Sequence, residues 1–122
     1  FIETLNFIQA VGFSRIHIFP YSLRQGTKAA QMHGHLPRPV KEERVKRAEA
    51  IARELAQAYR ERLLDQVVEV LIEETNRDGY GEGFAQEYLR VQVKEVQEPN
   101  TLFNARIVQA DREPLTGVVV AL

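Results

Sequence analysis

Hydrophobic and polar residues repeat with two different periods along the chain, and the period changes near Asp65. Before this residue, apolar side chains recur every three or four positions, which is the spacing of one face of an α-helix. After it, they recur at every second position, which is the spacing of a strand with one buried face. The pattern predicts a first half built on helices and a second half built on β-strands.

A short helix is predicted over residues 2–11, where Leu5 and Ile8 share one face. Gly12 follows at the position where helices commonly end in a left-handed glycine. Because the helical pattern begins at once after Phe1, with no initiating methionine, we expect the chain to be a piece of a larger protein.

A strand is predicted over residues 15–19 (Arg-Ile-His-Ile-Phe), ended by Pro20. A helix, a glycine turn and an apolar strand make half of a βαβ unit, whose strands lie in parallel sheets buried on both faces. No partner strand is evident, so we expect residues 1–19 to cause self-association, or residues 1–35 to be poorly ordered. His17 lies inside the apolar run and is expected to be packed, with one ring nitrogen satisfied.

Residues 20–39 form a long polar connection, and loops of this length are usually functional or flexible. A long helix is predicted to begin at Pro39, with an apolar stripe along about 24 residues. The stripe comprises Val45, Ala48, Ile51, Ala52, Leu55, Tyr59 and Leu63. Basic residues interspersed with glutamates near its start favour a solvated face over a phosphate-binding stripe. They are Arg38, Lys41, Arg44, Lys46 and Arg47.

The second half of the chain predicts five short strands separated by turn signals rich in Asn, Asp, Gly and Pro. Five short strands in fewer than 60 residues favour a small closed or partly closed barrel. In the third strand, Leu89, Val91 and Val93 are expected to face the core. The predicted strands are Gln66–Ile72, Gly79–Gln86, Glu87–Lys94, Leu102–Gln109 and Gly117–Leu122.

The formal net charge of −1 conceals an uneven distribution. Residues 1–37 carry three basic groups and one acid, and residues 38–65 carry eight basic and six acidic groups. Residues 66–122 carry five basic and ten acidic groups. The β-rich half is therefore clearly acidic, which opposes binding to a polyanion unless a local basic patch is present.

Cysteine is absent, which excludes disulfides, thiolate catalysis, iron–sulfur ligation and cysteine zinc sites within these residues. No apolar run approaches the roughly 18 residues that a membrane span needs, and no secretory signal pattern opens the sequence. The composition is that of an ordinary globular chain without a membrane partner.

The stretch from His17 to Met32 (HIFPYSLRQGTKAAQM), followed by Pro37 and by VKEER at residues 40–44, is not generic. It resembles the end of the radical-SAM domain of the tRNA methylthiotransferases, where Tyr-Ser-x-Arg-x-Gly-Thr-x-Ala-Ala-x-Met precedes a long helix. The Phe-Pro-Tyr-Ser variant is most similar to the MtaB-like branch, which acts on threonylcarbamoyl-adenosine beside the anticodon. In that family a five-stranded RNA-binding barrel, the TRAM domain, follows the helix. Residues 66–122 are similar to it at Val70–Glu74, Gly79–Tyr80 and Glu87–Val91.

The resemblance implies an α+β fold with three parts. Residues 1–38 would be a helix–strand remnant of a radical-SAM barrel, residues 39–65 a connecting helix, and residues 66–122 a five-stranded antiparallel barrel of the TRAM or OB type. The cytoplasmic parent enzyme would use 4Fe-4S clusters and S-adenosylmethionine to place a methylthio group on C2 of a modified adenosine in tRNA. Its cluster ligands are cysteines, which this chain lacks. We therefore expect the chain to be inactive alone, with its barrel serving to dock tRNA.

The loop after the predicted strand contains the family motif residues Tyr21, Ser22, Arg24, Gly26 and Thr27. Loops at the carboxyl ends of barrel strands commonly carry function, so Arg24 is a candidate contact for a phosphate or for the carboxylate of S-adenosylmethionine. A structural role, closing the barrel through backbone contacts at Gly26, is favoured over it.

The pair His33 and His35 is an incomplete metal site, because two imidazoles without a nearby carboxylate do not complete a ligand set. We expect both to be solvent-exposed loop histidines and expect no metal. For the barrel, RNA binding combines exposed aromatic rings with basic side chains. Phe84 is expected inside the barrel, and Tyr88 and Arg90 on one outer face are the favoured contacts. The candidate tRNA-binding residues are Tyr80, Tyr88, Arg90, Lys94 and Arg106.

Two other functions remain open at this point. An acidic barrel is also compatible with a protein-interaction module that docks on its own enzyme or on a partner protein. A free-standing small-ligand barrel is disfavoured, because residues 66–122 contain no convergent cluster of titratable groups.

Overall fold

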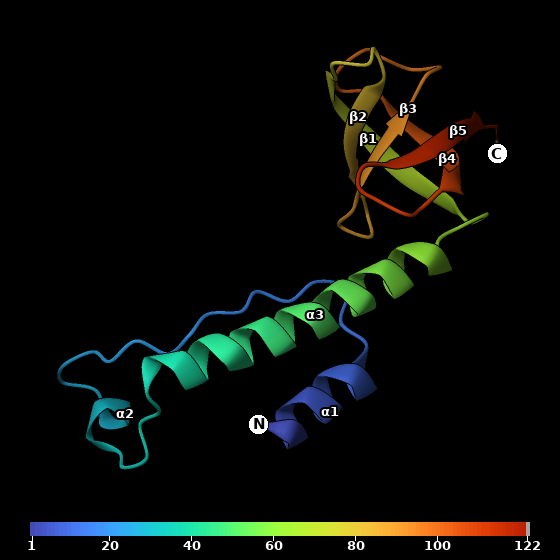
Figure 1. Ribbon diagram of the computed structural model, residues 1–122. Coiled ribbons are helices and arrows are strands. Elements are labelled where there is room, and N and C mark those ends of the chain that lie inside the picture. Colours follow the sequence, from blue (N-terminus) through green and yellow to red (C-terminus); the bar gives the residue numbers. More distant parts are fainter. Residues whose placement is uncertain (122) are drawn as a thin grey trace. The chain divides into compact units, whose positions relative to one another are not determined.

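The computed structural model describes residues 1–121 and divides into two compact units, Phe1–Ala56 and Gln57–Leu122. Figure 1 shows the three helices of the first half and the five strands of the second. Helix α3 (Arg38–Arg62) runs through the boundary between the units. Each unit is described by itself below.

The first unit begins with α1 (Ile2–Val11), as predicted. Gly12 ends it in the left-handed conformation, with φ 72° and ψ 45°, and its amide donates to the carbonyl oxygen of Ile8. Leu5 of α1 and Ala48 of α3 are the buried hydrophobic residues of this unit within the described part of the chain. The guanidinium of Arg44 lies 5.0 Å from the centre of the Phe1 ring.

The predicted strand at residues 15–19 is wrong: this segment is extended but irregular. A strand exists only where a neighbouring strand accepts and donates its backbone hydrogen bonds, and the described residues of this unit provide none. The prediction for His17 is also wrong, because its side chain is exposed, as is that of Phe19 at 82%. The apolar spacing predicted a buried sheet, whereas only Ile16 and Ile18 are partly covered.

The polar connection contains one helical turn, α2 (Lys28–Gln31), which the sequence pattern did not predict. Thr27 is its N-cap, since its hydroxyl oxygen accepts a hydrogen bond from the amide of Ala30 at 3.2 Å. The long helix is confirmed as α3, beginning at Arg38, one residue before the expected proline. The paired charges Arg38–Glu42 and Arg47–Glu43 lie exposed on it, as expected of a solvated face.

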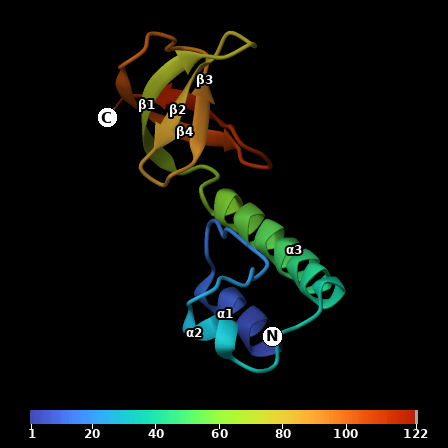
Figure 2. The ribbon, with the colours of Figure 1, turned by 90° about the vertical axis from the view of Figure 1, so that its left-hand side faces the viewer.

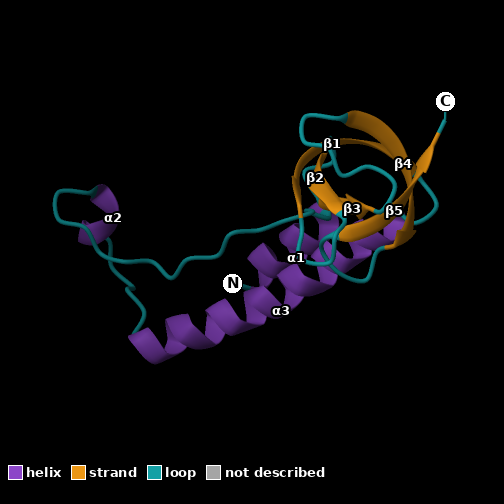
Figure 3. Cartoon of the chain, turned by 90° about the horizontal axis from the view of Figure 1, so that it is seen from above, coloured by secondary structure: helices purple, strands orange, loops and turns teal. Residues whose placement is uncertain are grey.

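The second unit is a closed barrel of five strands in the order β1-β2-β3-β5-β4 (Figures 2 and 3). The strands are β1 (Val67–Thr75), β2 (Gly81–Ala85), β3 (Arg90–Val93), β4 (Leu102–Gln109) and β5 (Leu115–Val120). Four of the five pairings are antiparallel, and β3 pairs with β5 in parallel. The five-stranded barrel is confirmed. The expectation that it is antiparallel throughout is corrected, because a closed ring with an odd number of strands cannot reverse direction at every pairing.

The barrel interior follows the predicted alternation. Leu89, Val91 and Val93 are buried as expected. The third strand is shorter than predicted, because residues 86–89 form the β2–β3 turn. The fifth starts two residues earlier than predicted, and Leu122, at its predicted end, lies outside the described residues. The core comprises Val68, Val70, Ile72, Ala85, Leu89, Val91, Val93, Ala105, Ile107, Ala110 and Leu115.

The last turns of α3 cover part of this core. Tyr59 and Leu63 pack against it. The hydroxyl of Tyr59 donates to the carbonyl oxygen of Glu87 at 3.4 Å, and the guanidinium of Arg60 donates to that of Ala110 at 3.4 Å. Among residues 1–121, none of the helices combines the length and apolar character needed to span a membrane.

Candidate nucleic-acid interface on the barrel

The outward side chains of the barrel form rows that cross neighbouring strands. In the first row, Leu102 pairs with Leu71, Leu71 with Phe84, and Phe84 with Arg90. Phe84 is 42% exposed, so the expectation that it fills the interior is wrong. The inward positions of β2 are taken by Gly81, Gly83 and Ala85 instead. A β-carbon at Gly83 would overlap the carbonyl oxygen of Leu71, so β1 lies too close for any larger residue there.

Arg90 is bound to three carboxylates. Its Nε lies 2.7 Å from Oε2 of Glu82, and its two terminal nitrogens lie 3.1 Å from Glu74 and 3.6 Å from Glu73. Burial lowers the pKa of Arg90, but the hydrogen bond and charge of Glu82, with the charges of Glu73 and Glu74, outweigh it, so this pKa is raised. We call Arg90 together with Glu73, Glu74 and Glu82 the Arg90 clamp. With three acids around one base, its net charge is negative.

The second row is polar and is held by hydrogen bonds between side chains. The amide nitrogen of Asn76 donates to Gln92 at 2.7 Å and to Glu82 at 3.2 Å. Gln92 donates to the hydroxyl of Thr116 at 3.1 Å, and that hydroxyl donates to Gln109 at 3.3 Å. These bonds occupy the polar atoms of this row and join the β1–β2 turn to β3, β5 and β4.

The third row, which we call the cationic row, consists of Tyr80, Lys94, Val118, Arg106 and Val67. The ammonium nitrogen of Lys94 lies 5.4 Å from the centre of the Tyr80 ring. Tyr80, Lys94 and Val118 line one shallow depression. Arg106 of β4 stands directly opposite Val118 on one side and Val67 on the other.

The cations of this row differ from Arg90 in their surroundings. Lys94 and Arg106 are exposed, and within the described residues neither forms an ion pair with a carboxylate. One acid, Glu95, lines the depression beside Lys94. The same-face neighbours of Arg106 along β4 are Asn104 and Val108, which are uncharged.

The structure separates the five candidate barrel residues into two groups. Tyr80, Lys94 and Arg106 belong to the cationic row. Arg90 lies in the clamp, and Tyr88 lies in the β2–β3 turn with φ 62° and 82% exposure. Tyr88 therefore does not follow the strand alternation that was expected to align it with Arg90. The sequence indicated neither the clamp nor the role of Val118 and Val67, because both depend on which strands are neighbours.

The motif residues Tyr21 to Thr27 lie on an exposed loop of the first unit. The hydroxyl of Thr27 donates to the carbonyl oxygen of Arg24 at 2.8 Å, and Gly26 has φ 83°. These bonds shape the loop itself. Arg24 and Ser22 are exposed, and their predicted functional contacts stay predictions.

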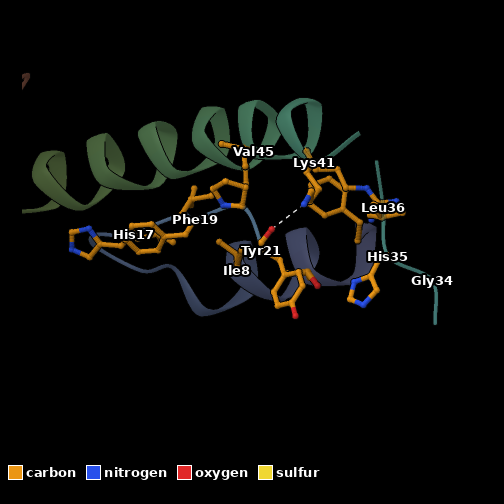
Figure 4. Close-up of a pocket in the computed structure, with 16 residues that line it drawn as sticks. Ile8, His17, Phe19, Tyr21, Gly34, His35, Leu36, Lys41 and Val45 are labelled. Atoms are coloured by element: carbon orange, nitrogen blue, oxygen red, sulfur yellow. Dashed lines mark hydrogen bonds between the residues drawn. The ribbon is translucent and has the colours of Figure 1, made fainter. Parts of the chain in front are cut away.

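Figure 4 shows an apolar groove in the same unit, lined by Ile8, Phe19, Leu36 and Val45 among others. Lys41 also lines this groove, and its ammonium donates to the carbonyl oxygen of Tyr21 at 3.0 Å. The ring of Tyr21 stacks on His35 with centroids 5.6 Å apart.

His33 and His35 are exposed, and residues 1–121 contain no group of three or more side chains suited to hold a metal. An iron–sulfur cluster is held by cysteine thiolates, and the chain has none. The residues of this chain therefore do not fit such a cluster.

Comparison with known proteins identifies relatives of this chain. The threonylcarbamoyladenosine tRNA methylthiotransferase MtaB of Bacillus subtilis (strain 168) is 37% identical over 102 residues, covering 80% of this chain and 23% of that protein. A tRNA-2-methylthio-N(6)-dimethylallyladenosine synthase of Caldicellulosiruptor saccharolyticus is 36% identical over 122 residues, covering 98% of the chain and 26% of the relative. The chain is homologous to part of the tRNA methylthiotransferases.

The homology extends to a protein of Chlamydia pneumoniae that is also named threonylcarbamoyladenosine tRNA methylthiotransferase MtaB, 32% identical over 121 residues, covering 98% of the chain and 29% of the relative. The chain spans between about a fifth and a third of the length of these curated relatives. No family model matches it. The relatives do not favour the alternative of a protein-interaction module.

Proposed function

We propose that this chain is the C-terminal part of a tRNA methylthiotransferase and that its barrel docks the tRNA substrate. The observation that carries the proposal is the homology over 80–98% of the chain to enzymes whose names specify methylthiolation of tRNA. The closed barrel with exposed aromatic and cationic side chains supports it, since these are the groups that bind RNA phosphates and bases.

The acidity of the barrel half is compatible with this role, because charge acts over short distances. At physiological salt the Debye length is about 8 Å, so a phosphate at one face of the barrel responds mainly to the charges of that face. The three glutamates of the Arg90 clamp account for part of the acidic excess and hold a cation of their own.

Catalysis is assigned to the rest of the parent enzyme. The parent would use 4Fe-4S clusters and S-adenosylmethionine, and the residues that hold the clusters would lie outside this chain, because it has no cysteine. The chain alone is expected to bind tRNA without modifying it. The substrate nucleoside is expected to be an adenosine beside the anticodon that already carries a threonylcarbamoyl group.

A filter-binding titration of the 122-residue chain with unfractionated bacterial tRNA tests this proposal. Two phosphate contacts, one for each of the exposed cations Lys94 and Arg106, predict that log K falls against log salt with a slope of about −1.4 to −1.8. Bovine serum albumin, an acidic protein without such a barrel, serves as the control. Absent or salt-independent binding by both this chain and the full-length enzyme would refute tRNA docking.

A further inference from the structure

We propose that the cationic row (Tyr80, Lys94, Val118, Arg106 and Val67) is the part of the barrel surface that contacts RNA, and that the Arg90 clamp, separated from it by the second row, takes no part in this contact. This inference deepens the proposed tRNA docking and rests on it. It selects one face among the outward rows of the barrel, and it reverses the ranking expected from the sequence, which favoured Tyr88 and Arg90.

The choice rests first on which cations are available. A phosphate that approached Arg90 would have to displace Glu82 at 2.7 Å and Glu74 at 3.1 Å from its guanidinium. It would also meet the charges of three carboxylates, which repel it. Lys94 and Arg106 carry no such competitors among the described residues, so their charges are available to phosphate oxygens.

The second argument is the spacing within the row. Lys94 of the β3 end and Arg106 of β4 flank Val118 of β5, so their backbones are two strand spacings apart, about 10 Å. One nucleic-acid strand advances about 3.4 Å along the helix axis per phosphate. The two cations thus reach two phosphates of one strand that are about three phosphate steps apart, with about two further phosphates between them.

The third argument concerns the groups beside the cations. Val118 and Val67 are each more than 40% exposed and place apolar side chains on either side of Arg106. Tyr80 is half-buried and held under the ammonium of Lys94, so its ring is positioned before RNA arrives. A ribose or base can pack on this surface while the two cations hold the backbone.

Neutral substitutions at the two cations test the face, with Arg112→Gln as the matched control, because Arg112 is an exposed cation of the β4–β5 turn outside the row. Arg106→Gln and Lys94→Gln should each weaken tRNA binding about 3- to 10-fold and reduce the salt slope by about 0.7–0.9. The double variant should bring the slope close to zero. Arg112→Gln should stay within about twofold of wild type.

Tyr80→Leu separates stacking from charge. It should weaken binding by about fivefold or more at every salt concentration and leave the salt slope unchanged. Circular dichroism of each variant verifies that the barrel is folded. If the wild-type chain and the full-length enzyme fail to bind tRNA, the proposed function falls. If the wild type binds and Arg112→Gln weakens it as much as Arg106→Gln, tRNA docking stands and the choice of face is refuted.

Discussion

Replacing Arg90 by methionine separates a structural role of this residue from a role in RNA binding. Methionine keeps an unbranched apolar side chain over the Phe84 ring, above which the guanidinium now lies at 4.9 Å, but it removes the charge. Glu73, Glu74 and Glu82 are then left close together without the cation that holds them. The expected result is a less stable barrel with unchanged affinity for tRNA.

The magnitude follows from the exposure of each pair. The Glu82 pair has side-chain exposures of 25% and 12%, and its charged hydrogen bond contributes about 1.5 kcal/mol. Glu73 and Glu74 are 46% and 62% exposed, so solvent screening reduces each of these pairs to a few tenths of a kcal/mol. The total is about 2 kcal/mol, which lowers the melting temperature of a unit of this size by about 10 °C.

Thermal and urea unfolding followed by circular dichroism measure this loss. Added sodium chloride should recover part of it, because salt screens the repulsion among the three carboxylates. Because the pKa of Arg90 is raised in the folded state, the contribution of its charge to stability is complete below the pKa of free arginine. This contribution is lost only as the pH rises through the higher folded-state pKa. The deficit is therefore constant between about pH 6 and pH 9. Unchanged stability together with weakened tRNA binding would refute the structural role of Arg90 and would indicate that Arg90 contacts RNA.

Three further predictions test other parts of the fold. Gly83→Ala should destabilise the barrel by about 3 kcal/mol or more. The added β-carbon would overlap the carbonyl oxygen of Leu71 and lie 3.1 Å from the amide nitrogen of Glu73. An unchanged urea midpoint would contradict this close approach. Thr27→Ala should destabilise the helical turn α2 by about 1 kcal/mol. Hydrogen exchange at the amide of Ala30 should then be faster, while exchange at the barrel amides stays unchanged. Equal exchange at Ala30 in the wild type and the variant would exclude the cap. Since residues 15–19 have no strand neighbour within the described chain, the chain is expected either to self-associate or to leave residues 1–35 poorly ordered in solution. A monomer by light scattering that also has a well-ordered N-terminal strand would disprove this.

The helices and the barrel were largely predictable, because both depend on local periodicity. Gly12 ends α1 with the left-handed geometry that glycine adopts most readily. The alternation over residues 89–93 also placed Leu89, Val91 and Val93 correctly in the core. The turn at Asn76 was indicated by residue types whose side chains bond nearby backbone groups. The side-chain oxygen Oδ1 of Asn76 accepts from the backbone amides of Asp78 and Tyr80.

The same periodicity failed where an element needs a partner distant in the sequence. Residues 15–19 have the composition of a buried strand, but strand formation needs a neighbour that this chain does not supply in its described part. Phe84 was assigned to the interior by its size. It lies outside because the inward positions of β2 are taken by Gly81, Gly83 and Ala85, which leaves Phe84 on the outward side of the alternation.

The sequence by itself determined the helices α1 and α3, the presence of five short strands and the relationship to the tRNA methylthiotransferases, since each of these is encoded by residues near one another in the chain. Only the tertiary structure decided which cations are available. Arg90 and Arg106 are equivalent in sequence, as basic residues at outward positions of strands. Strand pairing places three glutamates around the first, whereas it places Val118 and Val67 opposite the second and leaves it without an ion pair among the described residues. The charge of a side chain is known from the residue itself. Whether that charge is neutralised depends on residues distant in the sequence that the register of the sheet brings close.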